Sequence, residues 1–366
     1  MRDPSALDNA EEFRLVSTDR AMRGWVCRDL PEELFADFVR DPDRFLDVPS
    51  RNILRDGSKA KVVKQVLKDR GGGTREVIIK RFQYGSFLRR LVFLFFPSPA
   101  RRSLAGALVL KGAGIGTPSP LAALEWRSWR RLGTSYYISE DVRGCQSLRN
   151  LWWGAGPPSE ERAGGRRRIL SGLASLFYRL HSSGIYHRDL KGSNILVRGD
   201  GRGDAELLLI DLDGVRKGRR LSQRKRIKNL FQLYQTLARH RLSVREMLFF
   251  LKGYADLFSM PRKERKGLAR AILESSRRWE RRFESTHGRL IEEFEQRRRE
   301  SPTLVEALAR RPILIMQLKG RSRFNRWSRR MARRRGPADR PRLYVTMAKP
   351  WLFGSRIEKV EMKDRL

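Results

Sequence analysis

The residues most suited to chemistry lie in one stretch of ten, His187 to Leu196, which reads H-R-D-L-K-G-S-N-I-L. Asp189 can orient an acceptor hydroxyl and take its proton, and Asn194 offers an amide oxygen to a magnesium ion. Lys191 would lie beside the transferring phosphate as a positive charge. A proton acceptor, a metal ligand and a cation on one short loop are the groups that transfer of a phosphoryl group from a nucleotide requires.

The same stretch matches the catalytic-loop template of protein kinases, H-R-D-L-x-x-x-N, at every fixed position. A polar turn between two apolar segments is the alternative interpretation, and the coincidence of four specified residue types argues against it. Kinases also use a lysine at the end of a strand to bind the nucleotide phosphates, and an aspartate as a second metal ligand. Lys80, which ends the strand V-I-I-K, and Asp211, which follows the strand E-L-L-L-I, fit these roles. Asp213, in I-D-L-D-G, is the alternative choice or an auxiliary ligand.

Two further segments would line the nucleotide. Asp56-Gly57-Ser58 lies where a turn could fold over the phosphates, because glycine lets backbone amides approach them. A single glycine without the G-x-G-x-x-G spacing also fits an ordinary turn. The strand S-Y-Y-I-S at 135–139 leads into a hinge whose backbone would meet the adenine edge. The candidate nucleotide-binding residues besides Lys80 are Gly57, Ser58, Glu140 and Val142.

Hydrophobic periodicity predicts the elements that position these residues. Strands rich in valine and isoleucine at 62–66 and 77–80, joined by Gly71 to Gly73, form a hairpin. Ser98-Pro99 opens a helix that ends at Gly112, in the place of the kinase αC helix. This helix contains no glutamate, the usual partner of the strand lysine. Either Lys80 is held in another way or the alignment is shifted.

The second half of the chain is mostly helical in pattern. Apolar residues predict helices at 169–180, at 227–237 and from the capping box at 243–246 onward. Strands are expected at 194–197 and 206–210. An A-P-E motif is absent from the sequence, which argues against a protein substrate. Near the start of the chain, a short amphipathic helix is expected at 29–39, and residues 1–20 are expected to be poorly ordered.

The composition points to anionic partners. The chain has 366 residues, enough for two or three domains, and 79 Lys and Arg against 41 Asp and Glu give it a net charge of +38. Such a surface attracts nucleic acid, acidic lipid or phosphorylated glycolipid, although a generally basic proteome would explain part of the excess. Cys27 and Cys145 have no disulfide-framework or metal-site spacing, which favours a reducing compartment.

Neither a signal peptide nor a membrane span is expected. The most apolar run, at 91–96, is far shorter than the roughly 20 residues that cross a bilayer, and its flanking arginines suit either an anionic membrane surface or a buried connector. The segment 321–335 places Phe324 and Trp327 among arginines. It fits a surface that follows nucleic-acid phosphates, an interfacial amphipathic helix or a solvated basic helix.

In these motifs the chain resembles the lipopolysaccharide kinases of the Kdo/WaaP family, which are similar to protein kinases in fold. The resemblance covers about residues 24–260. Its segments are G-W-V at 24–26, D-P-D-R at 41–44, V-I-I-K at 77–80, G-I-G-T-P at 114–118, the catalytic loop, L-I-D-L-D at 209–213 and F-L-K-G-Y at 250–254. It implies ATP-dependent phosphorylation of a sugar hydroxyl, Kdo or heptose, on lipid-linked core oligosaccharide at the cytoplasmic face of the inner membrane. The helix without glutamate, the single-glycine loop and the basic extension depart from the family pattern.

We therefore predict an α+β, two-lobed, protein-kinase-like fold with ATP and Mg²⁺ as cofactors. The expected parts are an N-terminal extension (1–45), a β-rich N-lobe (46–142), a helical C-lobe (143–262) and a basic helical extension (263–366). The expected partners are a lipid-linked sugar and an anionic membrane surface, with nucleic acid less favoured. The alternatives are a protein serine/threonine kinase-like enzyme and a pseudokinase-like scaffold that binds nucleic acid or anionic membrane through its basic tail.

Overall fold

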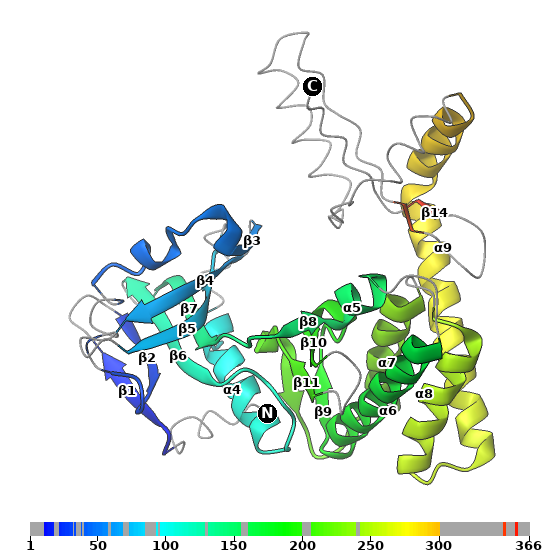
Figure 1. Cartoon of the computed structure of the whole chain (residues 1–366), viewed down its shortest axis with the longest axis horizontal. Coiled ribbons are helices and arrows are strands. Elements are labelled where there is room, and N and C mark those ends of the chain that lie inside the picture. Colours follow the sequence, from blue (N-terminus) through cyan, green and yellow to red (C-terminus); the bar gives the residue numbers. More distant parts are fainter. Residues whose placement is uncertain are drawn as a thin grey trace. The chain divides into compact units, whose positions relative to one another are not determined.

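The structure is a computed structural model of the whole chain (Figure 1). It describes residues 11–17, 22–31, 33, 38, 40–57, 60–68, 73–84, 93, 96–128, 131–154, 160–199, 206–238, 242–300, 347–348 and 356–357. The chain divides into two compact units. One comprises residues 1–233 and 244–269, and the other comprises residues 234–243 and 270–366. Both of the expected lobes therefore lie largely in the first unit.

A seven-stranded sheet forms the N-lobe, with the strand order β1-β2-β6-β7-β5-β4-β3. The strands are β1 (Phe13–Ser17), β2 (Met22–Cys27), β3 (Ile53–Gly57), β4 (Ala60–Lys68), β5 (Thr74–Phe82), β6 (Pro120–Ser128) and β7 (Arg131–Glu140). All neighbouring strands run antiparallel. The hairpin predicted at 62–66 and 77–80 is confirmed as β4 and β5, where Val63 lies opposite Ile79.

The sheet begins earlier in the chain than the sequence suggests. Residues 13–17 form a strand, so the expectation of poor order over the whole of 1–20 is wrong. The boundary expected after residue 45 is also wrong, because β2 pairs with β6 and belongs to the N-lobe sheet. Gly24 explains the close pairing, since a Cβ at this position would lie 2.1 Å from the carbonyl oxygen of Ala123.

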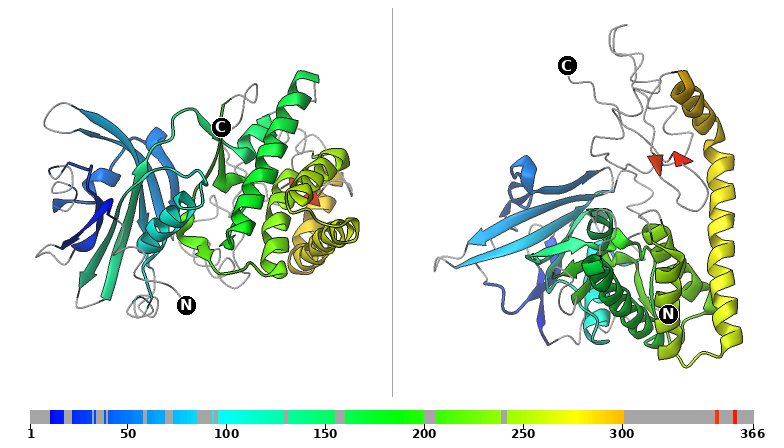
Figure 2. Two further views of the ribbon diagram at one scale, coloured as in Figure 1. Left: turned by 90° about the horizontal axis from the view of Figure 1, so that it is seen from below. Right: turned by 45° about the vertical axis from the view of Figure 1, so that its right-hand side comes forward.

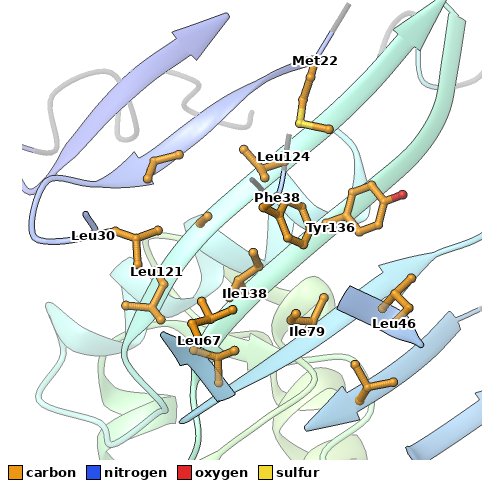
Figure 3. Close-up of a cluster of buried hydrophobic side chains, with 14 residues drawn as sticks. Met22, Leu30, Phe38, Leu46, Leu67, Ile79, Leu121, Leu124, Tyr136 and Ile138 are labelled. Atoms are coloured by element: carbon orange, nitrogen blue, oxygen red, sulfur yellow. The ribbon is translucent and has the colours of Figure 1, made fainter. Parts of the chain in front are cut away.

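Two apolar clusters pack on the sheet. The first joins residues of the sheet, such as Ile79 and Ile138, to Leu30, Phe38 and Leu46 from the segment between β2 and β3 (Figure 3). Two short 3-10 helices, η1 (Arg44–Leu46) and η2 (Ser50–Asn52), belong to this segment. The helix expected at 29–39 falls mostly outside the described residues.

Helix α4 (Pro99–Lys111) packs against the sheet (Figure 2). The second cluster lies between them and includes Ala100, Leu104, Phe82 and Tyr137. The predicted bounds of this helix are confirmed. The Ser98 hydroxyl accepts a hydrogen bond from the N–H of Arg101 at 3.1 Å, and Gly112 caps the other end. Because β5 alternates, Val77 and Ile79 are buried in the first cluster, whereas Lys80 lies on the face that carries α4.

The C-lobe consists of helices and two small sheets, one of three strands and one of two. Its helices are α5 (Leu148–Gly154), α6 (Glu160–Ser182), η3 (Gly192–Asn194), η4 (Leu212–Gly214), α7 (Gln223–Ala238) and α8 (Val244–Leu257). Its strands are β8 (Cys145–Ser147), β9 (Ile185–His187), β10 (Ile195–Arg198), β11 (Glu206–Leu209) and β12 (Val215–Lys217). The predicted helices and strands of this region are thus confirmed. The turn after α6 uses Gly184 at φ 69°, and a Cβ there would meet the carbonyl oxygen of Gly218 at 2.1 Å.

Helix α9 (Arg262–Glu300) starts in the first unit and continues into the second. The second unit resumes at residue 270, whereas the C-terminal extension is expected from the sequence to start at residue 263. Strands β13 (Met347–Ala348) and β14 (Arg356–Ile357) pair with each other. The basic segment at 321–335 lies outside the described residues. Within the described part of the chain, no helix is both long and apolar enough to cross a lipid bilayer.

Candidate active site

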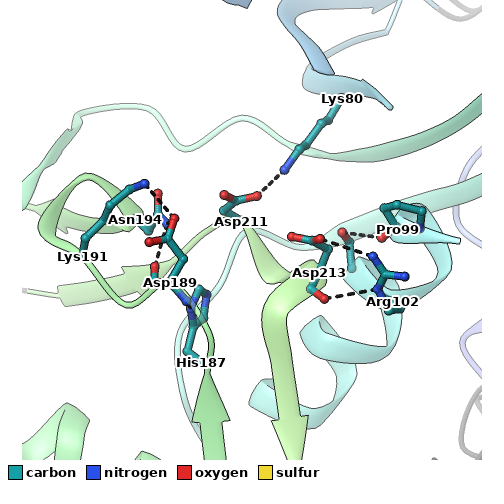
Figure 4. A network of polar contacts seen from close by, with 10 residues as sticks. Lys80, Pro99, Arg102, His187, Asp189, Lys191, Asn194, Asp211 and Asp213 are labelled. Atoms are coloured by element: carbon teal, nitrogen blue, oxygen red, sulfur yellow. Dashed lines mark hydrogen bonds and ion pairs between the residues drawn. The ribbon is translucent and has the colours of Figure 1, made fainter. Parts of the chain in front are cut away.

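Lys80 and Asp211 meet between the two lobes of the first unit (Figure 4). Lys80 comes from β5, and Asp211 follows β11, so their positions depend on two separate sheets. The Nζ atom of Lys80 donates a hydrogen bond to Oδ1 of Asp211 and forms an ion pair with it. Both side chains are largely buried, with 14% and 25% of their surfaces exposed. Asp211 is therefore the partner of Lys80 in a fold whose α4 helix has no glutamate.

The backbone of Asp211 adopts φ 64° and ψ 52°, in the left-handed region. Aspartate tolerates this region better than most residues, and such conformations concentrate at functional sites. Burial raises the pKa of the Asp211 carboxyl, but the charge and hydrogen bond of Lys80 outweigh burial and hold the pKa below its usual value. Asp211 is thus ionised at neutral pH, as a metal ligand has to be.

The catalytic-loop residues form a second group beside this pair. Oδ2 of Asp189 accepts hydrogen bonds from Nζ of Lys191 at 2.7 Å and from Nδ2 of Asn194 at 3.4 Å. Nδ2 of Asn194 also donates to the backbone oxygen of Asp189 at 2.8 Å. These bonds fix the amide and leave its oxygen as the atom that a metal could bind. The N–H of Ile210 donates to the backbone oxygen of Asn194 at 3.0 Å, which ties the loop to the residue before Asp211.

The residues predicted to bind nucleotide besides Lys80 come from the end of β3 and from the chain at and after the end of β7. Ser58 lies outside the described residues. Gly57 ends β3 next to the turn, but a Cβ at this position would meet only the carbonyl oxygen of Ala60, at 3.9 Å, so space does not require glycine here. The sequence alternative of an ordinary turn fits this geometry.

The hinge follows β7. The N–H groups of Glu140 and Asp141 donate to the backbone oxygens of Ser119 and Glu76, at 2.9 and 3.0 Å. Val142 is the first hinge residue whose N–H has no hydrogen bond to a described residue. The side chain of Lys64 lies 2.6 Å from Asp141 and secures the hinge to β4.

The donors present fit a magnesium nucleotide. Asp211 and Asn194 supply one carboxylate and one amide oxygen, which are hard ligands of the type that Mg²⁺ prefers. Mg²⁺ usually takes few protein ligands and fills its octahedron with phosphate oxygens and water. Lys80, on β5 of the other sheet, supplies a cation beside Asp211, where nucleotide phosphates would need one.

Comparisons with known proteins bear on the family and on the fold. Residues 83–254 match the sequence model of the lipopolysaccharide kinase (Kdo/WaaP) family. Among solved structures, WaaP in complex with acyl carrier protein is similar with a TM-score of 0.50, over 72% of this chain and 98% of that chain. Over residues 83–254 the kinase-like domain therefore resembles the Kdo/WaaP family. The solved WaaP is 21% identical, so its likeness shows the fold alone, and it confirms the predicted kinase-like fold.

A curated relative carries less information. CBL-interacting protein kinase 20 of Oryza sativa subsp. japonica is 43% identical over 68 residues, which make up 19% of this chain. The match spans only 14% of that protein's length. It is a further local similarity to a kinase.

Helix α7 holds the catalytic loop of this kinase-like domain through side chains that sequence patterns did not single out. Nδ2 of Asn229 donates to the backbone oxygen of His187 at 2.5 Å, and Oδ1 of Asn229 accepts from the His187 N–H at 3.4 Å. Gln232 bonds the backbone of Arg188 and Leu190 on the same loop. The one available signal was an asparagine within an otherwise apolar helical face. Burial keeps the pKa of His187 below its usual value, so its ring is neutral and can accept the N–H of Asp189.

Helix α4 of the kinase-like domain contacts the loop after Asp211 through the side chain of Arg102. The guanidinium of Arg102 lies 3.5 Å from Oδ2 of Asp213, and its Nε donates to the Asp213 backbone oxygen at 3.4 Å. Gly106, one turn further along, brings the helix so close that a Cβ would lie 2.6 Å from the Leu212 oxygen. Asp213 is thus occupied by Arg102, which favours Asp211 over Asp213 as the metal-facing carboxylate.

Proposed function

We propose that the chain transfers the γ-phosphoryl group of ATP to a sugar hydroxyl of lipopolysaccharide core, Kdo or heptose, or of a similar envelope glycolipid. The observation that carries the proposal is the meeting of Lys80 and Asp211 beside the Asp189–Asn194 loop, within a domain that resembles the Kdo/WaaP family. The family supports the use of ATP and a sugar acceptor. The roles of the individual residues and of Mg²⁺ are part of the proposal.

In this proposal each residue has one task. Lys80 neutralises and positions the nucleotide phosphates, and the backbone of Glu140 and Val142 meets the adenine. Asp211 and Asn194 hold Mg²⁺, which would draw charge away from the phosphates. Asp189 orients the acceptor hydroxyl and accepts its proton, while Nζ of Lys191 donates a hydrogen bond to that carboxylate at 2.7 Å and holds it in place. Rate enhancement of this kind comes from positioning and from charge neutralisation.

The test is phosphate transfer to purified core oligosaccharide, read by mass spectrometry of the product. Asp189→Ala and Asp211→Asn are expected to abolish transfer and to leave the melting temperature near that of the unmodified chain. Asp47→Ala, which removes an exposed carboxylate outside the site, is the matched control and should retain activity. Full activity in either site variant would overturn the assignment.

The two alternative functions give different results in the same samples. A protein acceptor would leave the oligosaccharide unmodified and place phosphate on protein hydroxyls, as detected by phosphoproteomics. A scaffold without catalysis would show no rise in melting temperature when ATP and Mg²⁺ are added together. The intact set of Asp189, Asn194 and Asp211 favours the enzyme.

We also propose peripheral association with an anionic membrane surface, at the cytoplasmic face of the inner membrane. Support comes from the net charge of +38, because cationic surfaces bind acidic lipid headgroups. Co-sedimentation with vesicles is expected to require anionic lipid and to weaken as salt rises. Equal binding to neutral vesicles would contradict this proposal.

A further inference from the structure

The sequence where β3 ends and the chain turns into β4, Asp56 to Lys59, holds one glycine, Gly57, whose surroundings would admit a Cβ. A segment with one glycine offers fewer close backbone amides to phosphates than a glycine-rich loop, so side chains have more of the phosphate charge to neutralise. The strands on either side of this segment are therefore the place to search for a second cation.

The strand register places Arg55 on the same face of the sheet as Lys80. Arg55 lies opposite Val62 in the β3–β4 pair, and Val62 lies opposite Lys80 in the β4–β5 pair. Residues directly opposite each other in antiparallel strands project from the same face. Arg55, Val62 and Lys80 thus form one row across three strands, on the face from which Lys80 reaches Asp211.

Arg55 is exposed, and its side chain makes no hydrogen bond or ion pair with a described residue. An arginine so placed can offer two parallel N–H groups to a phosphate, which a lysine cannot do.

We propose that Arg55 binds the nucleotide phosphates as a second cation beside Lys80, in place of the backbone amides of a glycine-rich loop. The inference rests on the proposed function, because it requires a nucleotide at Lys80 and Asp211. An exposed arginine on β3, the edge strand of the sheet, could instead serve only to discourage strand pairing between molecules. In that case its loss would change solubility and leave nucleotide affinity unchanged.

The experiment is isothermal titration calorimetry of the full chain with a non-hydrolysable ATP analogue and Mg²⁺. Arg55→Ala is expected to weaken binding of the analogue about tenfold, as loss of a charge-assisted contact does, and to leave adenosine binding unchanged. Arg55→Lys should recover part of the loss. Lys61→Ala is the control, because Lys61 lies opposite Asp56 and Arg81 in the next row of the same strands and so projects from the other face. It removes the same charge and should bind normally.

The outcomes distinguish a failure of the Arg55 role from a failure of the proposed function. If Lys80→Ala abolishes binding of the ATP analogue and Arg55→Ala leaves its affinity unchanged, Arg55 does not bind the phosphates and the proposed function stands. If the unmodified chain binds no nucleotide, both proposals fall. Equal weakening by Arg55→Ala and Lys61→Ala would also overturn the role of Arg55, since it would show an effect of total charge. The melting temperature of each variant verifies that it is folded.

Discussion

Arg102 on helix α4 is paired with Asp213, two residues beyond the carboxylate that faces Lys80, at 3.5 Å between Nη2 and Oδ2. Its Nη1 also donates to the backbone oxygen of Pro97 at 2.8 Å, which holds the guanidinium at the start of the helix. The helix in the αC position therefore secures the loop that carries Asp211. It does not secure the lysine.

The first prediction concerns this pair. Arg102→Ala is expected to lower kcat about tenfold and to weaken the apparent affinity for Mg²⁺, because Asp211 loses its positioning. Asp213→Asn should resemble it, and the double variant should be little worse than either single variant, with a coupling energy of about 1 kcal/mol. Arg101→Ala is the control, since the preceding arginine lies over the Trp25 ring at 4.5 Å and not over the loop. Equal losses in the two arginine variants would contradict the assignment.

A second prediction follows from the packing of α4 on the same loop. Gly106→Ala would place a methyl group 2.6 Å from the Leu212 oxygen and 3.1 Å from Cβ of Val215, so the helix has to move away. We expect a loss of about 1–3 kcal/mol in the free energy of unfolding, despite the better helix propensity of alanine. Gly267→Ala in α9 meets nothing within 4 Å and should be neutral or stabilising. Urea unfolding measures both variants, and a stable Gly106→Ala protein would show that the contact is loose.

Asn229 offers a third prediction. It is fully buried and bonds both the N–H and the carbonyl of His187, so Asn229→Ala leaves backbone groups without partners. The expected cost is about 2–4 kcal/mol, together with a fall in kcat as the loop loses its support. Asn150→Ala, at an exposed asparagine of α5, should change neither quantity. A normal unfolding curve for Asn229→Ala would mean that water replaces both hydrogen bonds.

The pH dependence of stability gives a fourth prediction. Burial, aided by the charge of Arg226, lowers the pKa of His181 to about 3. The unfolded chain takes up this proton near pH 6.5, so the free energy of unfolding falls as pH decreases from about 6.5 towards 3, by up to roughly 1.4 kcal/mol per pH unit. His181→Gln cannot take up the proton, and its stability should depend less steeply on pH. Urea unfolding at pH 7.5, 6.5 and 5.5 compares the slopes, and identical slopes would rule out this contribution.

The sequence predicts those elements whose stabilising contacts are local in the chain, and it fails for elements whose partners lie far away in the sequence. Helix α4 was bounded correctly because its signals, Ser98 and Gly112, are local. Strands β1 and β2 were missed because they are short and depend on a distant partner, since β1 pairs with β2, and β2 pairs with β6 about a hundred residues away. Periodicity within a segment carries no information about such a partner.

The candidate site shows the same division. Asp189 and Asn194 could be singled out from one motif, and the fold brings them into contact within a single loop. The ion pair between Arg102 and Asp213 joins the two lobes, so no spacing in the sequence predicts it. The partner of Lys80 was open for the same reason, and it is an acid 131 residues further along the chain.

The ion pair between Lys80 and Asp211 also determines how the site responds to its ligands. In the free protein each charge already satisfies the other, so a metal ion alone has to displace an ammonium group, and a nucleotide alone has to leave a carboxylate facing its phosphates. The complex of both supplies a cation to Asp211 and anions to Lys80 in one event. Metal and nucleotide should therefore bind with positive cooperativity, each strengthening the other by the same factor. Titration of each ligand with and without the other measures that factor, and a value of one would show that the pair imposes no such coupling.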